Sequence, residues 1–143
     1  MANIVRSFMA ERILKGKLET INRKDVSVSS AGLIDMDGMP ADPIAAAVLA
    51  DHGIDGTNHH SRLLTEEMVS DSDMIIVTEE IHIKMIADQY PDAAGKISLL
   101  KSFSRDYSEA FGDIRDPYKL SMYHYRLCFS EIYLSIDGLL KCI

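Results

Sequence analysis

The chain has 143 residues, 47% hydrophobic and 26% charged, which is typical of one soluble globular domain spanning residues 1–143. Its formal net charge of −7 argues against nucleic-acid binding by bulk electrostatic attraction, although a local phosphate pocket is compatible with it. The apolar runs are far shorter than a membrane span and no secretion signal is recognisable, so we expect a cytoplasmic protein without membrane or nucleic-acid partners.

The first half of the chain is predicted to form a helix, a strand and a second helix. Apolar residues at helical spacing predict the first helix over residues 7–18, with Ser7 as its N-cap. The run VSVSSAG predicts a strand over residues 26–30. Asp42 then caps a helix that Gly53 ends, because aspartate accepts from helix-start amides and glycine adopts the left-handed conformation that follows a helix.

The second half continues the alternation of helices and strands. A short helix is expected from Thr65, a buried strand over residues 74–77 and a helix that stops at Pro91. A second buried strand follows over residues 96–100, and a long helix over residues 116–143 closes the chain. The apolar residues predicted to share one face of that last helix are Leu120, Tyr123, Leu127 and Leu134.

Strands separated by helices indicate an α/β fold in which a short parallel sheet is covered by helices on both faces, a three-layer sandwich. In such sheets, ligands bind beyond the carboxyl ends of the strands. We therefore look for the functional residues in the loops that follow the strands.

The only two cysteines, Cys128 and Cys142, are too few for a disulfide framework and lack the spacing of metal ligands. Both fall in the predicted last helix, where they are expected to act as small apolar residues in a reducing compartment. We expect neither a metal nor a cofactor.

Six short motifs resemble those of the low-molecular-weight protein tyrosine phosphatases. In chain order they are ANIVRSFMAE, SSAG, PADP with the following VLADHGID, HHSRLLT, DMIIVTEEIH and DIRDPY. Each motif alone is weak evidence, but all six occur in the family's order and at its separations, over nearly the whole chain. The resemblance implies the family's three-layer fold and a phosphate-binding loop at the start of the first helix.

The chemistry of phosphate transfer explains what such a loop must supply. A phosphate monoester dianion needs backbone amides at a helix N-terminus, and an arginine to clamp two of its oxygens. A thiolate attacks phosphorus, and a carboxylic acid protonates the leaving oxygen.

The resemblance assigns these roles to particular residues. Arg6 matches the arginine that clamps the phosphate, and Ser7 matches the hydroxyl that supports the thiolate. Asn3 matches the residue that holds the loop in its strained shape, while Ile4 and Val5 belong to the same phosphate-binding loop. Phosphoarginine-directed relatives carry a threonine in the place of Ile4, so a phosphotyrosine substrate is expected.

Further positions complete the site that the resemblance implies. Ser30 resembles a serine that supports Asn3. Asp116, placed by Pro117 on the loop before the last helix, matches the general acid. Tyr118 resembles an aromatic residue that flanks the substrate ring at the rim of the pocket.

The sequence departs from the family pattern at its beginning. The family's nucleophilic cysteine stands six residues before the arginine, which in this numbering falls ahead of Met1. The family's first, central strand would precede it. We therefore expect a phosphatase-family protein that is catalytically inactive as given and that binds an anion weakly at Arg6.

Two alternatives remain open. A longer natural chain would carry the strand and the cysteine and would be an active protein tyrosine phosphatase. Alternatively, the chain is a non-catalytic anion-binding or dimeric regulatory module.

The absent first strand would lie between residues 26–30 and residues 74–77 of this chain. Its absence would leave strand edges without a neighbour, and such edges tend to pair with another chain. We expect either that the two flanking strands pair directly or that a second copy fills the gap, giving a homodimer through the strand edges.

Overall fold

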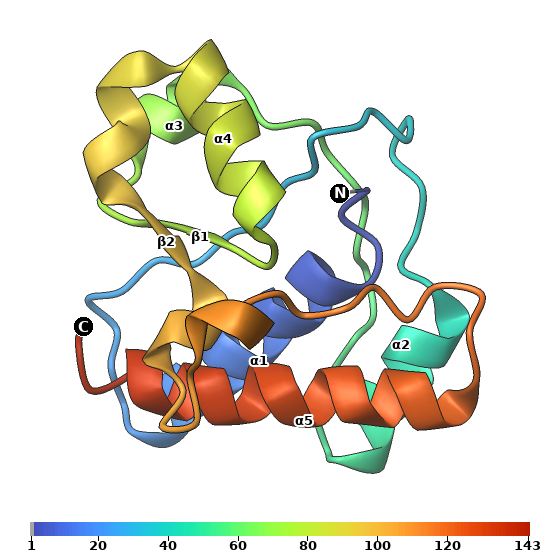
Figure 1. Cartoon of the computed structure of the whole chain (residues 1–143). Coiled ribbons are helices and arrows are strands. Elements are labelled where there is room, and N and C mark those ends of the chain that lie inside the picture. Colours follow the sequence, from blue (N-terminus) through green and yellow to red (C-terminus); the bar gives the residue numbers. More distant parts are fainter. Residues whose placement is uncertain (1) are drawn as a thin grey trace.

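The computed structural model describes residues 2–143, the side chain of Phe111 excepted, and arranges them in three layers (Figure 1). A short sheet lies between two groups of helices. On one face of the sheet lie α3 (Glu66–Asp71) and α4 (Glu80–Gln89), and on the other lie α1 (Arg6–Thr20), α2 (Pro43–Asp51) and α5 (Met122–Leu139). None of the helices within the described residues is long and apolar enough to cross a membrane.

The sheet consists of two parallel strands, β1 (Ile75–Val77) and β2 (Ile97–Leu99), with Ile76 opposite Ser98. Val77 and Leu99 form a small core together with Ile86 of α4. The α/β class with a short parallel sheet is thus confirmed. Only the last residue of each strand is buried, so the prediction that residues 74–77 are buried on both faces is wrong.

The larger core lies among the helices on the other side of the sheet. Most of its fully buried side chains come from α1, α2 and α5, among them Phe8, Leu49 and Tyr125, and Leu100 and Ile114 join them from outside these helices. These helices therefore hold the loops at either end of them in fixed positions. Three short 3₁₀ segments complete the chain: η1 (Pro91–Lys96), η2 (Leu100–Phe103) and η3 (Glu109–Phe111).

Local sequence signals at two helix starts are confirmed. The carboxylate of Asp42 accepts from the amide of Ala45 at 3.1 Å, and the hydroxyl of Thr65 accepts from the amide of Met68 at 3.2 Å. Gly53 follows α2 with φ +71°, the left-handed conformation that glycine adopts without steric cost.

The start of α1 differs from the prediction. The helix begins at Arg6, and Val5 occupies the N-cap position without any side-chain cap. Ser7 lies inside the first turn, where its hydroxyl accepts from the side-chain amide of Asn3 at 3.0 Å. Ser7 is therefore not the N-cap, because its oxygen is engaged with the loop that precedes the helix.

Residues 26–30 do not form the predicted strand. Val26, Val28 and Ser30 are half-buried and alternate with exposed serines, as in a strand, but no ladder joins this extended segment to another within the described residues. The predicted direct pairing with β1 is therefore wrong. An extended segment shows alternating burial whenever one of its faces packs on apolar side chains. A strand of a sheet also needs a second extended backbone beside it, in register for hydrogen bonding.

The last helix is shorter than predicted and buries a different face. Its inward face comprises Tyr125, Cys128, Phe129, Ile132, Ser135, Ile136 and Leu139. The four apolar residues predicted to share a face are all exposed, Tyr123 by 69% and Leu134 by 57%. Cys142 lies beyond the end of the helix and is exposed, so only Cys128 is a buried small residue.

Candidate functional site

The candidate site lies where three segments meet at the N-terminus of α1. Residues 3–5 lead into the helix, and Thr78 follows the carboxyl end of β1. The loop before α5 joins this strand end through the amide of Ile114, which donates to the carbonyl of Thr78 at 2.9 Å. The site therefore has the position at which parallel sheets bind ligands.

Arg6 is the centre of the site. Its side chain is 5% exposed, and its Nη1 donates to the carbonyl of Ile114 at 2.7 Å. The same nitrogen lies 3.1 Å from Oε1 of Glu79, while Nη2 lies 3.8 Å from Oδ2 of Asp116. Two carboxylates thus flank one guanidinium beside a helix N-terminus, whose first amides lack intrahelical acceptors.

Asn3 organises the loop before the helix. Its φ of +62° is the left-handed conformation that asparagine tolerates better than most residues. Its buried side chain donates to the hydroxyls of Ser7 at 3.0 Å and Ser30 at 2.8 Å, and its oxygen accepts from the amide of Arg62 at 3.2 Å. The structure thus brings together three residues that the sequence singled out.

Glu11 extends this network into the helix. Its carboxylate accepts from the hydroxyl of Ser30 at 2.8 Å and lies 3.3 Å from the ammonium of Lys15. Burial by itself would raise the pKa of Glu11, but the bond from Ser30 and the charges of Lys15 and Arg12 lower it below its ordinary value. Glu11 is therefore ionised and anchors the serine that supports Asn3.

Ile4 and Val5 contribute their backbone groups, not their side chains, to the surface of the loop. Both side chains are buried in the larger core, and the carbonyl of Ile4 accepts from the amide of Asp42 at 3.0 Å. Because their side chains point into the protein, any contact of these residues with an anion would come from their amides.

Asp116 and Tyr118 lie on the loop before α5, at the exposed side of Arg6. The side chain of Asp116 is 44% exposed, and its Oδ1 accepts from the amide of Tyr118 at 3.1 Å. Tyr118 is 45% exposed, and the ammonium of Lys119 lies 5.5 Å from the centre of its ring. The structure therefore places a solvent-accessible carboxylate near the guanidinium, and an accessible aromatic ring two residues further along the same loop.

The sequence reasoning missed three residues that belong to the site. Glu79 and His82 have no role assigned from the sequence, although both stand in the motif DMIIVTEEIH, which leads from β1 into α4, where parallel sheets place functional groups. His59 begins the motif HHSRLLT, which assigns it no role. It is buried, and its Nε2 lies 2.6 Å from the carbonyl of Asn3, which accepts its hydrogen bond when that nitrogen is protonated.

Cys128 is a poor nucleophile. It is 3% exposed, and burial raises the pKa of its thiol to about 12, although the nearby charge of Arg6 acts in the opposite direction. The thiolate, not the thiol, attacks phosphorus. At neutral pH this residue is therefore a protonated core side chain.

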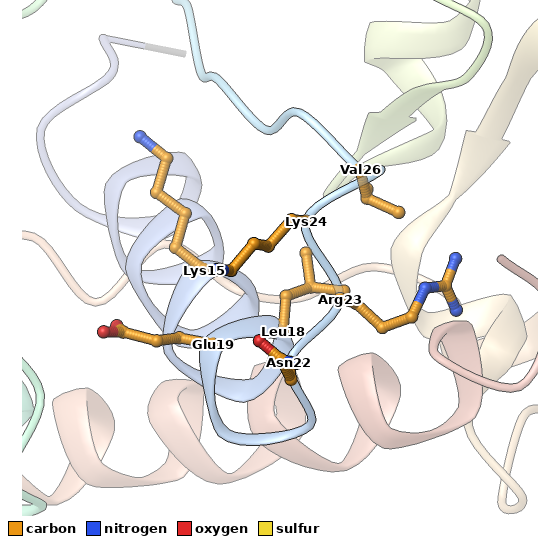
Figure 2. A pocket seen from close by; sticks show the side chains of 7 residues that line it. All are labelled: Lys15, Leu18, Glu19, Asn22, Arg23, Lys24 and Val26. Carbon is orange, nitrogen blue, oxygen red and sulfur yellow. The ribbon is translucent and has the colours of Figure 1, made fainter.

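A separate pocket, of about 210 Å³, lies elsewhere (Figure 2). It is formed at the C-terminal end of α1 and the segment that follows, by Lys15, Leu18, Glu19, Asn22, Arg23, Lys24 and Val26. Arg23 is already paired with Asp25 at 2.7 Å. Since Arg6 begins the same helix at its opposite end, this pocket and the Arg6 site are separate features.

Comparison with known proteins gives a consistent result. The model of the family described as low molecular weight phosphotyrosine protein phosphatase matches residues 1–143. A probable low molecular weight protein-tyrosine-phosphatase EpsP from Ralstonia nicotianae is 34% identical over 138 residues, covering 96% of this chain and 88% of the relative.

Solved structures agree with the sequence relatives. A low molecular weight protein tyrosine phosphatase from T. tengcongensis superposes with a TM-score of 0.91 at 32% identity, over all of this chain and 95% of the other. The YwlE arginine phosphatase from Geobacillus stearothermophilus superposes with a TM-score of 0.88 at 30% identity, over 99% of this chain and 87% of the other. The chain therefore belongs to the low molecular weight phosphotyrosine protein phosphatase family.

Proposed function

We propose that the chain binds phosphate monoesters, in particular phosphotyrosine in proteins, at the N-terminus of α1. The observation that carries this proposal is the buried guanidinium of Arg6, which lies beside the first amides of a helix and 3.8 Å from Asp116. A helix N-terminus and an arginine are both groups that favour phosphate dianions.

The proposed roles follow from this geometry and from membership of the family. Arg6 clamps the phosphate, and the amides of Ile4 and Val5 surround it. Ser7 and Asn3 hold the loop in the required shape, as their mutual hydrogen bond suggests.

Two residues on the loop before α5 complete the proposed site. Asp116 is positioned to protonate a leaving oxygen, and Tyr118 is exposed where it can flank the ring of a phosphotyrosine. The half-exposed carboxylate and ring leave the entrance to Arg6 accessible to a protein substrate.

We further propose that the 143-residue chain binds phosphate monoesters without turning them over. Cys128 is protonated and buried, and Cys142 lies on the surface after α5, so neither supplies a thiolate beside Arg6. In this form the protein is an anion-binding module of the cytoplasm.

Binding of inorganic phosphate, measured by isothermal calorimetry, tests the proposed site. Arg6→Met removes a charged donor, so its phosphate affinity should fall about tenfold or more, as expected for loss of charge-assisted hydrogen bonds. Arg126→Met, at an exposed position of α5, is the matched control and should bind like the wild type. Equal affinities in wild type and Arg6→Met would refute the proposal.

Hydrolysis of p-nitrophenyl phosphate tests the absence of turnover. The wild-type chain should show no activity above background. Hydrolysis that persists in the double variant Cys128→Ser, Cys142→Ser but is lost in Asp116→Asn would contradict this part of the proposal.

A second candidate function is phosphotyrosine hydrolysis by a longer form of the chain. It is favoured by the relatives, whose names describe them as phosphatases. Translation of the DNA upstream of the first codon tests it: an in-frame apolar segment that ends in cysteine would support the longer enzyme, and a stop codon directly upstream would exclude it.

We also propose a homodimer formed through strand edges. Among the described residues β1 pairs with β2 only, and the extended residues 26–30 take part in no ladder. Backbone groups of this kind pair readily with another chain.

A further inference from the structure

The carboxylate of Glu79 lies between two nitrogen-containing side chains. Its Oε1 is 3.1 Å from Nη1 of Arg6, and its Oε2 is 3.1 Å from Nε2 of His82. Glu79 is the N-cap residue of α4, yet its side chain makes no cap hydrogen bond. The carboxylate is therefore free of the helix that it begins and is shared between Arg6 and His82.

A bound phosphate and Glu79 would compete for the same donors. Nη1 of Arg6 already donates to the carbonyl of Ile114, and Glu79 is its second neighbour. An oxyanion bound by two parallel N–H groups must use donors of this guanidinium. When an anion binds, either Glu79 moves away from Arg6, or its carboxylate stays beside the dianion and the two negative charges repel each other.

His82 is placed to receive the carboxylate when it moves. The residue is 5% exposed, and its Nε2 is a buried polar atom without a hydrogen-bond partner among the described residues. The 3.1 Å separation from Glu79 is short enough, but the geometry is not that of a hydrogen bond. A buried polar nitrogen without a partner is uncommon in proteins, and the carboxylate of Glu79 is the charged acceptor within reach of this one.

We propose that Glu79 and His82 form a proton-linked latch on Arg6, acting as positioning residues for anion binding. With His82 neutral, Glu79 pairs with Arg6 and opposes the anion. When Nε2 of His82 takes a proton from solvent, Glu79 pairs with the imidazolium, and the guanidinium of Arg6 is released to the oxyanion. This inference rests on the anion-binding function proposed for Arg6.

The charges around His82 set the pH range of the latch. Among the described residues, Glu79 and Asp113 favour the protonated form of His82, and Arg6 opposes it. Burial is the largest influence and lowers the pKa of His82 below its ordinary value of 6.5. Asp116, beside Arg6, and His59, beside Asn3, are the other titratable groups whose contribution must be separated.

The sign of the pH dependence follows from these positions. The free protein holds His82 neutral at pH 7, because its pKa is lowered. An anion that displaces Glu79 toward His82 raises the pKa of the imidazole, so anion binding is coupled to proton uptake. By linkage, anion affinity must rise as the pH falls through this range.

Sulfate is the appropriate probe, because it remains a dianion throughout the relevant pH range. Calorimetric titration should show that wild-type sulfate affinity rises at least about fivefold from about pH 8 to about pH 5.5, the low end of couplings between linked sites. His82→Gln should lose this rise. Glu79→Gln should bind sulfate more tightly than the wild type at the higher pH and should also lose the rise.

Control variants separate the latch from other titrating groups. His60→Gln, at an exposed histidine outside the site, should keep the sulfate affinity and the pH dependence of the wild type. His59→Gln and Asp116→Asn alter the site and should change the affinity, but the rise in affinity toward low pH should persist in both. A rise that persists in His82→Gln, or that disappears in His59→Gln alone, would overturn the latch while leaving the anion site intact. Sulfate binding that is absent at every pH in both wild type and Glu79→Gln would refute the anion site itself.

A measurement on the wild-type protein tests the latch even if the His82→Gln variant does not fold. The ring nitrogen shifts of His82 in a ¹H–¹⁵N correlation spectrum report its pKa directly. Saturating sulfate should raise that pKa. An unchanged pKa of His82, with sulfate demonstrably bound in a manner that requires Arg6, would overturn the proposal.

Discussion

At the scale of single residues, Asn3 shows how one side chain defines a loop. Its amide donates to Ser7 and Ser30 and accepts from the backbone of Arg62, all while its own backbone is left-handed. An aspartate could not supply the two donors, and a glycine would not supply any of these bonds. The loop shape therefore depends on the chemistry of this residue more than on its conformational freedom.

Replacing Asn3 should destabilise the protein more than its backbone conformation alone would explain. Asn3→Ala leaves buried hydrogen-bonding groups unpaired, so the free energy of unfolding should fall by about 2–4 kcal/mol. Asn22 also has a positive φ, +57°, but it is exposed. Asn22→Ala should therefore cost only the conformational penalty of about 1–2 kcal/mol.

Urea unfolding of the two variants measures this difference. A loss that is equal in Asn3→Ala and Asn22→Ala would show that backbone strain, not the hydrogen bonds of Asn3, accounts for the effect.

Some residues of the site were predictable from the sequence and others were not. Arg6, Asp116 and Asn3 stand in motifs of conspicuous residue types, and the structure brings all three to the N-terminus of α1. Glu79 and His82 stand in the motif DMIIVTEEIH, but nothing in that motif indicates a contact with Arg6. Their significance arises from a contact with Arg6, which lies more than seventy residues away in the chain.

At the scale of elements, two helical glycines have opposite surroundings. A Cβ added to Gly16 of α1 would meet nothing within 4 Å. A Cβ on Gly138 of α5 would lie 1.8 Å from the carbonyl oxygen of Phe103 and 2.7 Å from its carbonyl carbon. The close packing of η2 against α5 therefore requires a residue without a side chain at position 138.

Alanine substitutions at these glycines should have opposite effects on stability. Gly16→Ala should stabilise the protein by about 0.5–1 kcal/mol, because alanine loses less conformational entropy in a helix. Gly138→Ala forces the backbones of α5 and η2 apart. This strain should outweigh the gain in helix propensity and lower the free energy of unfolding by about 1–3 kcal/mol. Thermal unfolding followed by circular dichroism compares the two, and a higher melting temperature for Gly138→Ala would contradict the observed packing.

The predictions for helices and strands failed where a local sequence pattern is compatible with more than one packing partner. Helix α5 has apolar residues on several faces, so periodicity alone could not decide that Tyr125 and Ile132 are buried while Leu134 is exposed. Residues 26–30 have the alternation of a strand, but a strand also requires a neighbouring backbone. In both cases the missing information was the identity of the packing partner.

At the scale of the whole molecule, the proposed dimer interface consists of the extended residues 26–30 and the edge of β1. In sedimentation equilibrium, the apparent molecular mass should rise toward that of two chains as the protein concentration increases. Ser27→Pro removes a backbone donor from residues 26–30, so it should weaken the dimer.

A variant on a different surface is the control for this experiment. Leu134→Lys alters the exposed face of α5 and should leave the dimer dissociation constant unchanged. A mass of one chain at every concentration would refute the dimer. Disruption by Leu134→Lys but not by Ser27→Pro would place the interface on α5 instead of on the strand edges.

The sequence by itself determined the α/β class, the helix starts at Asp42 and Thr65, and the motifs that contain Arg6 and Asp116. These features depend on residues close together in the chain, such as a cap and the amide three positions later. Only the tertiary structure decided which face of α5 is buried, whether residues 26–30 join a sheet, and that Glu79 and His82 adjoin Arg6. Those outcomes depend on which distant segments pack together, and that choice is made by the whole core at once.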